Sequence, residues 1–260
     1  MRAYRHTSDQ LARRALRTAT PRLIVAAVIM SGLTFVSSLN HAGAVTIPAF
    51  ANESGQKIMS AAMTAARVQG SFTSSSATTI SGQAYAEVTN SSATTGQQSL
   101  SLGNAKSVVR VVGGVVYIDD DAAAIQAQFG VSAPNDANKW IAIPSTNSNF
   151  VRFNSGILLA STLSEVTPGG TLRTTKTSTL QHKLVVGVTG KPNIHLGLAS
   201  GTETVYVAAT LPHVPVELVA TDAVQGQQET FVITFTNWGK NFHVTKPAAS
   251  IPISTTKLPN

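Results

Sequence analysis

The stretch TFVITFTNWGK at residues 230–240 decides the fold of this chain. Phe231, Ile233 and Phe235 alternate with threonine and valine, so an extended strand places these three large apolar side chains on one face. A period of two residues is typical of a sheet that has one buried face. The stretch therefore predicts a half-buried strand that ends in an aromatic-glycine corner.

Further β-rich runs precede this strand. Residues 204–208 and 216–220 complete a predicted β-meander with it. Upstream, Ser/Thr-rich and β-branched runs predict five more strands, at residues 70–77, 80–89, 97–102, 107–112 and 115–119. Gly113-Gly114 separates the last two strands and predicts a two-residue hairpin, because glycine accepts the positive φ that such a turn needs.

Two segments carry clear helix signals. Residues 52–68 contain an apolar stripe that includes Ile58 and Met59, and Gly70 ends the segment. Residues 122–129 directly follow three aspartates, whose carboxylates can cap a helix and favour its dipole. A calcium loop would need further oxygen ligands at regular spacing, so we interpret these aspartates as a helix cap and not as a metal site.

A third helix is expected from residue 147 or 148 to about residue 165, although Gly156 weakens it. The proline-rich tail, residues 246–260, is expected to lie extended on the surface. The remaining strands are predicted at residues 139–144, 172–180 and 183–188. Runs of strands flanked by helices, without βαβ alternation, indicate an α+β domain on an antiparallel sheet. About ten strands approach the limit for one open sheet, so strong curling is expected.

The N-terminal segment has the features of an export signal. Six arginines precede an apolar run at residues 23–36, and small-residue cleavage patterns follow at residues 42–44 and 49–51. The apolar run is shorter than the about 20 residues that a membrane span needs, which favours cleavage. We expect residues 1–44 to be a signal peptide or an uncleaved signal anchor, and residues 45–260 to form a single domain.

The charge of the chain is concentrated in this leader. Residues 1–22 hold six arginines and one aspartate, a net charge of +5 out of the total of +7. From residue 45 onward, thirteen Lys and Arg stand against eleven Asp and Glu. A nucleic-acid partner is therefore not expected, and any membrane association would come through the leader.

No motif for catalysis is found. The absence of cysteine excludes thiol catalysis, zinc-thiolate sites and lipid attachment through an N-terminal cysteine. There is no G-x-S-x-G elbow, and the loop at residues 187–192 lacks the spacing of a phosphate-binding loop. The histidines after the leader form no metal-binding pattern; they are His182, His195, His213 and His243. We therefore expect a protein that is not an enzyme and that has no cofactor or metal.

The order of motifs resembles one known family. The motifs are VVRVVGGVVYIDD at residues 108–120, NKWIAIP at 138–144, FTNWGK at 235–240 and HVTKP at 243–247. Together they resemble the actinobacterial envelope proteins related to the mycobacterial LppX/LprG lipoproteins, and the resemblance covers about residues 53–258. That family has a fold similar to the LolA and LolB lipoprotein carriers. This chain departs from the lipoproteins because it has no cysteine at the mature N-terminus.

The resemblance implies a curved antiparallel half-barrel of about 10–11 strands, with helices on its concave face. It also implies an exported, monomeric cell-envelope protein that binds or carries a lipid, an acylated glycolipid or a lipoglycan. The apolar residues expected to line the lipid cavity are Ile58, Met59, Val109, Val111, Val116, Ile118, Phe153, Ile157, Leu158, Phe231, Ile233 and Phe235.

Three alternatives stay open at this point. The apolar strand faces could form a filled core instead of a ligand cavity. The same half-barrel could serve as an extracytoplasmic sensor or protein-interaction domain, or as a structural wall protein. A register slip of one residue would also reverse every face assignment.

Overall fold

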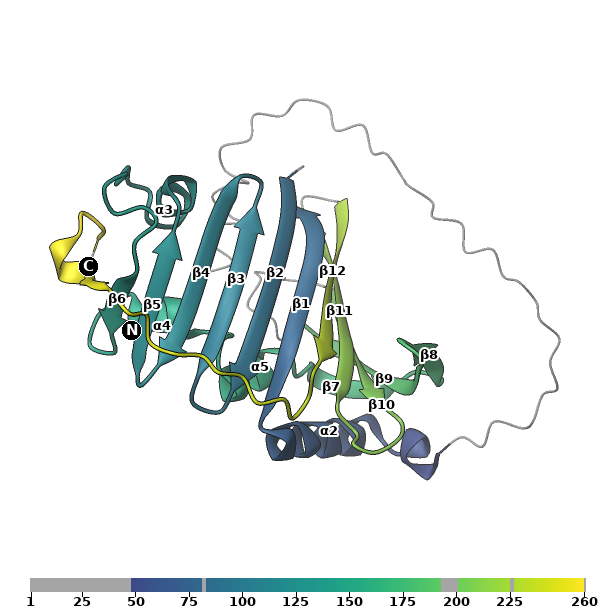
Figure 1. Ribbon diagram of the computed structural model, residues 1–260. Helices are drawn as coiled ribbons and strands as arrows, with labels where there is room; N and C mark the ends of the chain where they lie inside the picture. Colours follow the sequence, from purple (N-terminus) through teal and green to yellow (C-terminus); the bar gives the residue numbers. More distant parts are fainter. Residues whose placement is uncertain (1–47, 81–82, 193–200, 225–226, 260) are drawn as a thin grey trace.

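The computed structural model describes residues 48–80, 83–192, 201–224 and 227–259. A large, open, curved sheet of thirteen strands dominates it, with a few helices, which defines an α+β fold (Figure 1). The strands are β1 (Ser71–Ile80), β2 (Gln83–Ser92), β3 (Gly96–Leu102), β4 (Ala105–Val112), β5 (Val115–Asp120), β6 (Ile141–Pro144), β7 (Gly169–Thr174), β8 (Ser178–Leu180), β9 (Lys183–Lys191), β10 (Gly201–Ala208), β11 (Pro215–Val224), β12 (Gln227–Thr236) and β13 (Ile251–Pro252).

The strand order is β13-β6-β5-β4-β3-β2-β1-β12-β11-β10-β9-β7, with β8 paired to β9. Neighbouring strands are antiparallel except β13, which pairs with β6 in parallel. Two strands more than the eleven predicted ones are present. One arises because the predicted strand 172–180 is divided into β7 and β8, and the other is β13.

The helical elements are η1 (Ala49–Asn52), α2 (Gly55–Gln69), α3 (Ala122–Phe129), α4 (Phe150–Asn154), α5 (Leu159–Glu165) and η2 (Ile253–Thr255). The prediction of α2 is confirmed: Ser54 caps its first turn, and Gly70 ends it in the left-handed conformation at φ 75°. The capping role of the aspartates is also confirmed, because the Asp121 carboxylate accepts the Ala124 N–H at 2.7 Å.

The prediction of one continuous helix over residues 147–165 was wrong. Gly156 adopts φ +71° between α4 and α5 and interrupts the helix. A Cβ atom at this position would lie 2.9 Å from a Glu165 carboxylate oxygen, so a larger residue would have to displace that side chain as well as adopt a strained positive φ. The segment is therefore two short helices joined by a turn that lies against the sheet.

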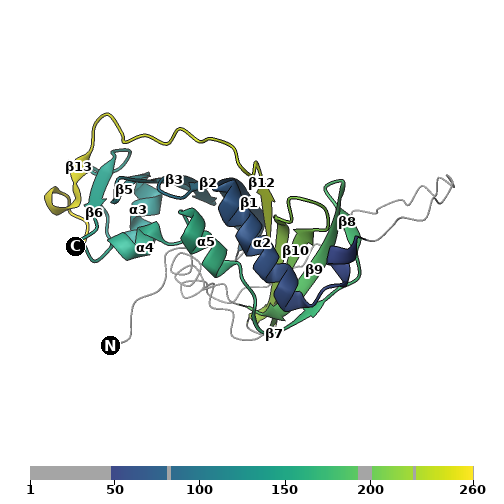
Figure 2. The same ribbon diagram turned by 90° about the horizontal axis from the view of Figure 1, so that it is seen from below.

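The prediction of a tail extended on the surface holds for residues 246–250 but was wrong for residues 251–258. Residues 237–250 cross the convex face of the sheet, and β13 then pairs with β6 at the far edge (Figures 1 and 2). The Ile251 N–H donates to the Trp140 carbonyl at 2.9 Å. Ile253 and Leu258 are buried among side chains of β4–β6. Apolar burial and a β-bridge hold this segment, although its sequence has no strand periodicity.

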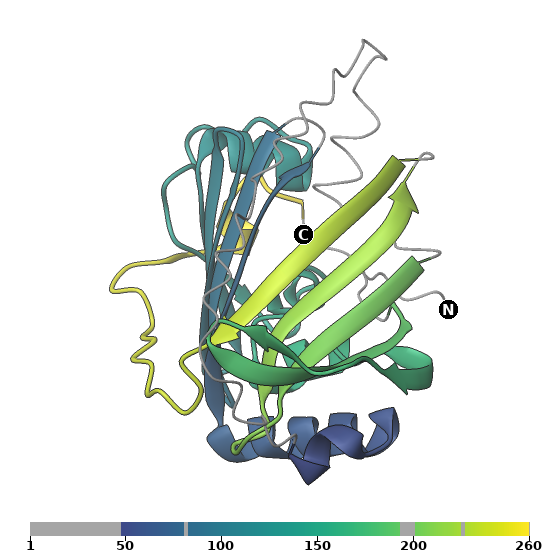
Figure 3. The ribbon, with the colours of Figure 1, turned by 90° about the vertical axis from the view of Figure 1, so that its right-hand side faces the viewer.

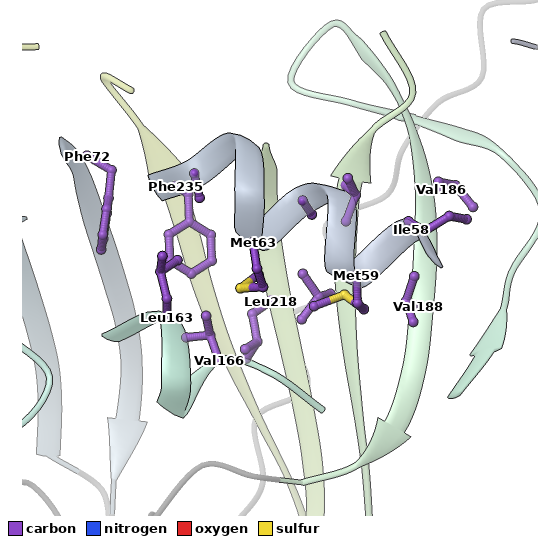
Figure 4. Close-up of a cluster of buried hydrophobic side chains, with 14 of the residues drawn as sticks. Ile58, Met59, Met63, Phe72, Leu163, Val166, Val186, Val188, Leu218 and Phe235 are labelled. Carbon is purple, nitrogen blue, oxygen red and sulfur yellow. The ribbon is translucent and has the colours of Figure 1, made fainter. Parts of the chain in front are cut away.

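Two separate hydrophobic cores lie on the concave side of the sheet. We call the cluster that α2 and α5 form with β9–β12 the first core (Figure 4). The second core joins α3, α4 and η2 to β4–β6. In Figure 3, strands β1–β4 and strands β10–β12 lie progressively farther apart with distance from the end that α2 covers.

The stretch at residues 230–240 belongs to the first core. Phe235 contacts Phe72 edge to face, with ring centroids 5.7 Å apart, and Trp238 lies 4.9 Å from the same ring. The Trp238 indole N–H donates to the Pro215 carbonyl at 2.9 Å. The aromatic-glycine corner thus fixes the end of β12 against β1 and β11.

Candidate functional site

The structure divides the predicted lining residues between the two cores. In the first core, Ile58, Met59 and Phe235 are buried, and Ile233 packs against them while remaining partly exposed. Six further residues are buried in the second core: Val109, Val111, Val116, Ile118, Phe153 and Ile157. Nine of the twelve predicted side chains, three plus six, are therefore enclosed within packed cores.

The remaining predicted residues are partly exposed. Leu158 packs on the edge of the second core, and Phe231 packs beside Tyr85 at a ring-centroid distance of 6.4 Å. Leu100 on β3, which was not predicted, is partly exposed in the same small cluster as Phe231. Partly exposed apolar side chains thus lie on the concave side between two closed cores.

A strip of polar side chains occupies the concave face of β1, β2 and β3. Strand pairing places Ser76 opposite Glu87, and Thr89 opposite both Ser74 and Gln98, so these side chains share one face. We call this set the polar strip; its members are Ser74, Ser76, Glu87, Thr89, Ser91 and Gln98. It separates the apolar strand faces of the first core from those of the second.

Hydrogen bonds connect the middle of the polar strip. The Gln98 side-chain amide donates to Glu87 Oε1 at 3.0 Å and to the Thr89 hydroxyl at 3.2 Å. The Tyr85 hydroxyl donates to Glu87 Oε2. These contacts hold the Glu87 carboxyl in one orientation on the concave face.

The turn between α4 and α5 lies at the end of the polar strip nearest β3's first residue. The Ser91 hydroxyl donates to the Ile157 carbonyl at 2.6 Å. Gly96 allows this close approach, because a Cβ atom there would lie 2.6 Å from the same carbonyl oxygen. The Ser155 hydroxyl also donates to Glu165 Oε1 at 2.6 Å, which fixes the Glu165 carboxyl near the strip.

Burial governs the protonation of these carboxyls. It raises the pKa of Glu87, the nearby Glu165 charge raises it further, and hydrogen bonds from Tyr85, Thr89 and Gln98 oppose the rise. Burial likewise raises the pKa of Glu165, against hydrogen bonds from Ser155 and Gly156. The pKa of Tyr85 is raised well above its usual value by burial and by the adjacent Glu87. The site therefore favours uncharged forms of its titratable groups.

Sequence reasoning missed the polar strip. In β2, Tyr85, Glu87 and Thr89 recur with a period of two and face inward, while the intervening Val88 is 46% exposed. This alternation was visible in the sequence. It was not recognised because Ser/Thr-rich strands ordinarily turn their polar side chains toward solvent.

A groove of about 530 Å³ lies on the outer side of α2, against the loop between β10 and β11. Val68 and Leu211 expose 79% and 83% of their surface at this groove. None of the twelve predicted residues lines it. The groove is therefore separate from the concave face.

The other residues considered from sequence have structural positions. His213 stacks on Phe50 with ring centroids 3.7 Å apart, and its Nδ1 lies 3.0 Å from the Ala208 carbonyl oxygen. His182 occupies the turn between β8 and β9, and His243 is exposed in the crossing tail. His195 and the leader at residues 1–44 lie outside the described residues. Within the described ranges, no three His, Asp or Glu side chains gather as a metal site would require.

Among the helices that the structure describes, none has the length and apolar character needed to span a bilayer.

Comparison with known proteins gives only distant likenesses. No protein-family model matches the chain, and a search of curated proteins finds no significant match. A solved structure of an uncharacterized conserved protein from Thermus thermophilus is similar, at 11% identity and a TM-score of 0.42, over 76% of this chain and 98% of that one. A DUF1329 family protein from Desulfovibrio piger matches at 7% identity and a TM-score of 0.28, over 71% and 92% of the two chains.

Proposed function

We propose that this protein is an exported, non-enzymatic carrier that binds a lipid on the concave face of a LolA-like half-barrel. One observation supports this most directly: partly exposed apolar side chains, Phe231 and Leu100 among them, lie on the concave side between two closed cores. A curved sheet that turns such side chains inward offers a protected surface for an acyl chain.

The two cores define the walls of this surface, and the exposed residues provide the contacts. Acyl chains would lie against Phe231, Ile233 and Leu158, whereas the nine enclosed residues support the walls. Burial of apolar area contributes roughly 25 cal/mol per Å², so a chain that covers a few hundred Å² is held with useful affinity. The protein would act as a monomer that takes up one lipid molecule.

The direct test is native mass spectrometry of the protein purified from its host, followed by lipid extraction. A co-purifying lipid of defined mass supports the carrier function. If no lipid co-purified and a second protein stayed bound instead, the result would favour the alternative function as a protein-interaction domain. N-terminal sequencing of the exported form would show whether the leader ends at Ala44 or Ala51, or is retained.

A matched pair of variants locates the binding surface. Phe231→Ser removes an inward apolar side chain, whereas Val232→Ser changes the next residue on the opposite face of β12. We expect the first variant, and not the second, to slow transfer of a fluorescent diacylglycerol between vesicles. Equal transfer rates for both variants would contradict binding on the concave face.

A further inference from the structure

The polar strip reverses the usual arrangement of a sheet. On β2, the polar residues Glu87 and Thr89 face the concave interior, whereas the apolar Val88 between them is 46% exposed on the other side. Polar groups withdrawn from water destabilise a fold unless they form hydrogen bonds. A purely structural sheet would gain by the opposite orientation, so the strip calls for a role in binding.

One member of the strip lacks a partner. Ser76 is 7% exposed, and in the described part of the chain its hydroxyl has no hydrogen-bond partner. Strand pairing places it directly opposite Glu87, on the same face. Glu87 itself is already bonded by Tyr85 and Gln98. The strip thus offers an unused neutral hydroxyl at Ser76, which can donate to or accept from an uncharged oxygen.

The carboxyls beside the strip belong to Glu87 and Glu165. Glu87 and Glu165 interact electrostatically with each other. Within the described residues, neither carboxyl forms a salt bridge with a lysine or arginine. An anionic group brought to this surface would lose its hydration without gaining a cation, and each carboxyl would repel it once that carboxyl is ionised.

We propose that the polar strip binds the uncharged ester or hydroxyl group of a neutral lipid, and that it excludes lipids with anionic headgroups. This inference rests on the proposed carrier function and specifies its ligand class. Ser76 would hydrogen bond to the lipid oxygen beside Glu87, Thr89 and Gln98. The Tyr85 and Phe231 rings flank this position, and the acyl chains extend over the exposed apolar side chains between the two cores.

The test compares two lipids with identical acyl chains. 1,2-Dioleoylglycerol carries only esters and a hydroxyl, whereas dioleoyl phosphatidic acid adds a phosphate. Equilibrium binding of each to the intact protein is measured by native mass spectrometry at neutral pH. We expect dioleoylglycerol to bind at least about tenfold more tightly, because no salt-bridging lysine or arginine among the described residues at the strip compensates the phosphate for its lost hydration.

Variants assign the effect to the strip. Ser76→Ala should weaken dioleoylglycerol binding by roughly two- to tenfold, the range expected for one lost hydrogen bond. Ser75→Ala is the matched control, since Ser75 is the adjacent residue on the opposite face of β1. Glu87→Gln keeps the side-chain shape but cannot ionise, so at a pH high enough to ionise Glu87 it should strengthen phosphatidic acid binding and narrow the difference between the lipids. Thermal unfolding of each variant verifies that the fold is retained.

The outcomes separate this inference from the proposed function. Equal affinity for the two lipids, or tighter binding of phosphatidic acid, would overturn the inference and leave the carrier function standing. Identical behaviour of Ser76→Ala and Ser75→Ala would also overturn it. Failure of both lipids to bind would overturn the carrier function itself.

Discussion

The first core is closed mainly by one helix of 15 residues, with the short helix α5 beside it, whereas the second core is closed by short segments alone. Helix α2 lays a continuous apolar stripe along β9–β11 (Figure 4). The second core instead combines α3 and α4 with Ile253 and Leu258 from the tail. The comparison teaches that one end of this sheet depends mainly on one long helix, whereas the other end depends on several short segments, including the distant tail.

The sharpest way to separate the two cores is to remove the distant part. Deletion of residues 251–260 removes β13 and takes Ile253 and Leu258 out of the second core. Loss of two buried aliphatic side chains should lower the free energy of unfolding by about 4–10 kcal/mol. Hydrogen exchange should show amides of β5 and β6 losing protection, while those of α2 keep theirs.

A shorter deletion controls for this effect. Removal of residues 259 and 260 alone costs the hydrogen bond from the Asn149 side chain to the Pro259 carbonyl, and no buried apolar side chain. We expect a loss of about 1 kcal/mol. Undiminished stability of the longer deletion would show that the tail does not support the second core.

The second prediction, with the next largest expected effect, concerns whether the two cores unfold together. Phe235→Ala opens the first core and Phe153→Ala opens the second, and each should cost about 3–5 kcal/mol. Because one continuous sheet joins the cores, we expect both variants to lower the midpoint of a single urea transition. Two separate transitions, monitored by fluorescence and circular dichroism, would mean that the cores are independent units.

These outcomes also bear on what the sequence could predict. Phe231, Ile233 and Phe235 form a local period of two, and Ile58 and Met59 a local helical stripe, so strand β12 and helix α2 could be predicted. The tail could not, because Ile251 pairs in parallel with Ile141 and no local pattern marks that contact. Distant pairing depends on the assembled sheet and not on neighbouring residues.

The candidate site was predictable only in its apolar half. Alternation identified inward-facing residues such as Val109 and Val111, but it could not show that the helices and tail enclose them. The polar strip was missed because its inward serines and threonines resemble those of a solvent-facing strand. Only the pairing of Ser76 with Glu87 reveals their common face.

A third prediction concerns pH and distinguishes the second core from the first. Asp120, buried at the end of β5, has its pKa raised from 3.8 to about 7, mainly by burial and further by Asp119 and Asp121. The folded state therefore holds this proton more tightly than the unfolded state does. The free energy of unfolding should fall as pH rises from about 4 to 7, by about 3 kcal/mol in total.

Asp120→Asn removes the titrating group while keeping its shape. We expect this variant to show a weaker pH dependence, with the remainder due to groups such as Glu87 and Glu165, and to exceed the original protein in stability at pH 8, with a much smaller difference near pH 4. Urea denaturation at a series of pH values measures both curves. If the free energy of unfolding of the variant fell with pH as steeply as that of the original protein, the effect would belong to other carboxyls.

The smallest effects are expected outside both cores. Val68 and Leu211 lie at the outer groove of α2 and are 79% and 83% exposed. Val68→Ser and Leu211→Ser should change the free energy of unfolding by less than about 0.5 kcal/mol. A larger loss in thermal unfolding would show that these side chains are covered in solution.

The crossing tail also sets an order of events during folding. Residues 251–258 leave the ribosome after all other parts of the second core, so β6 must wait with an unpaired edge until β13 has been synthesised. Contacts of such long sequence separation form late. This delay leaves one end of the sheet unfinished, with the free edge of β6 open to pairing with another strand, until residues 251–258 have been made.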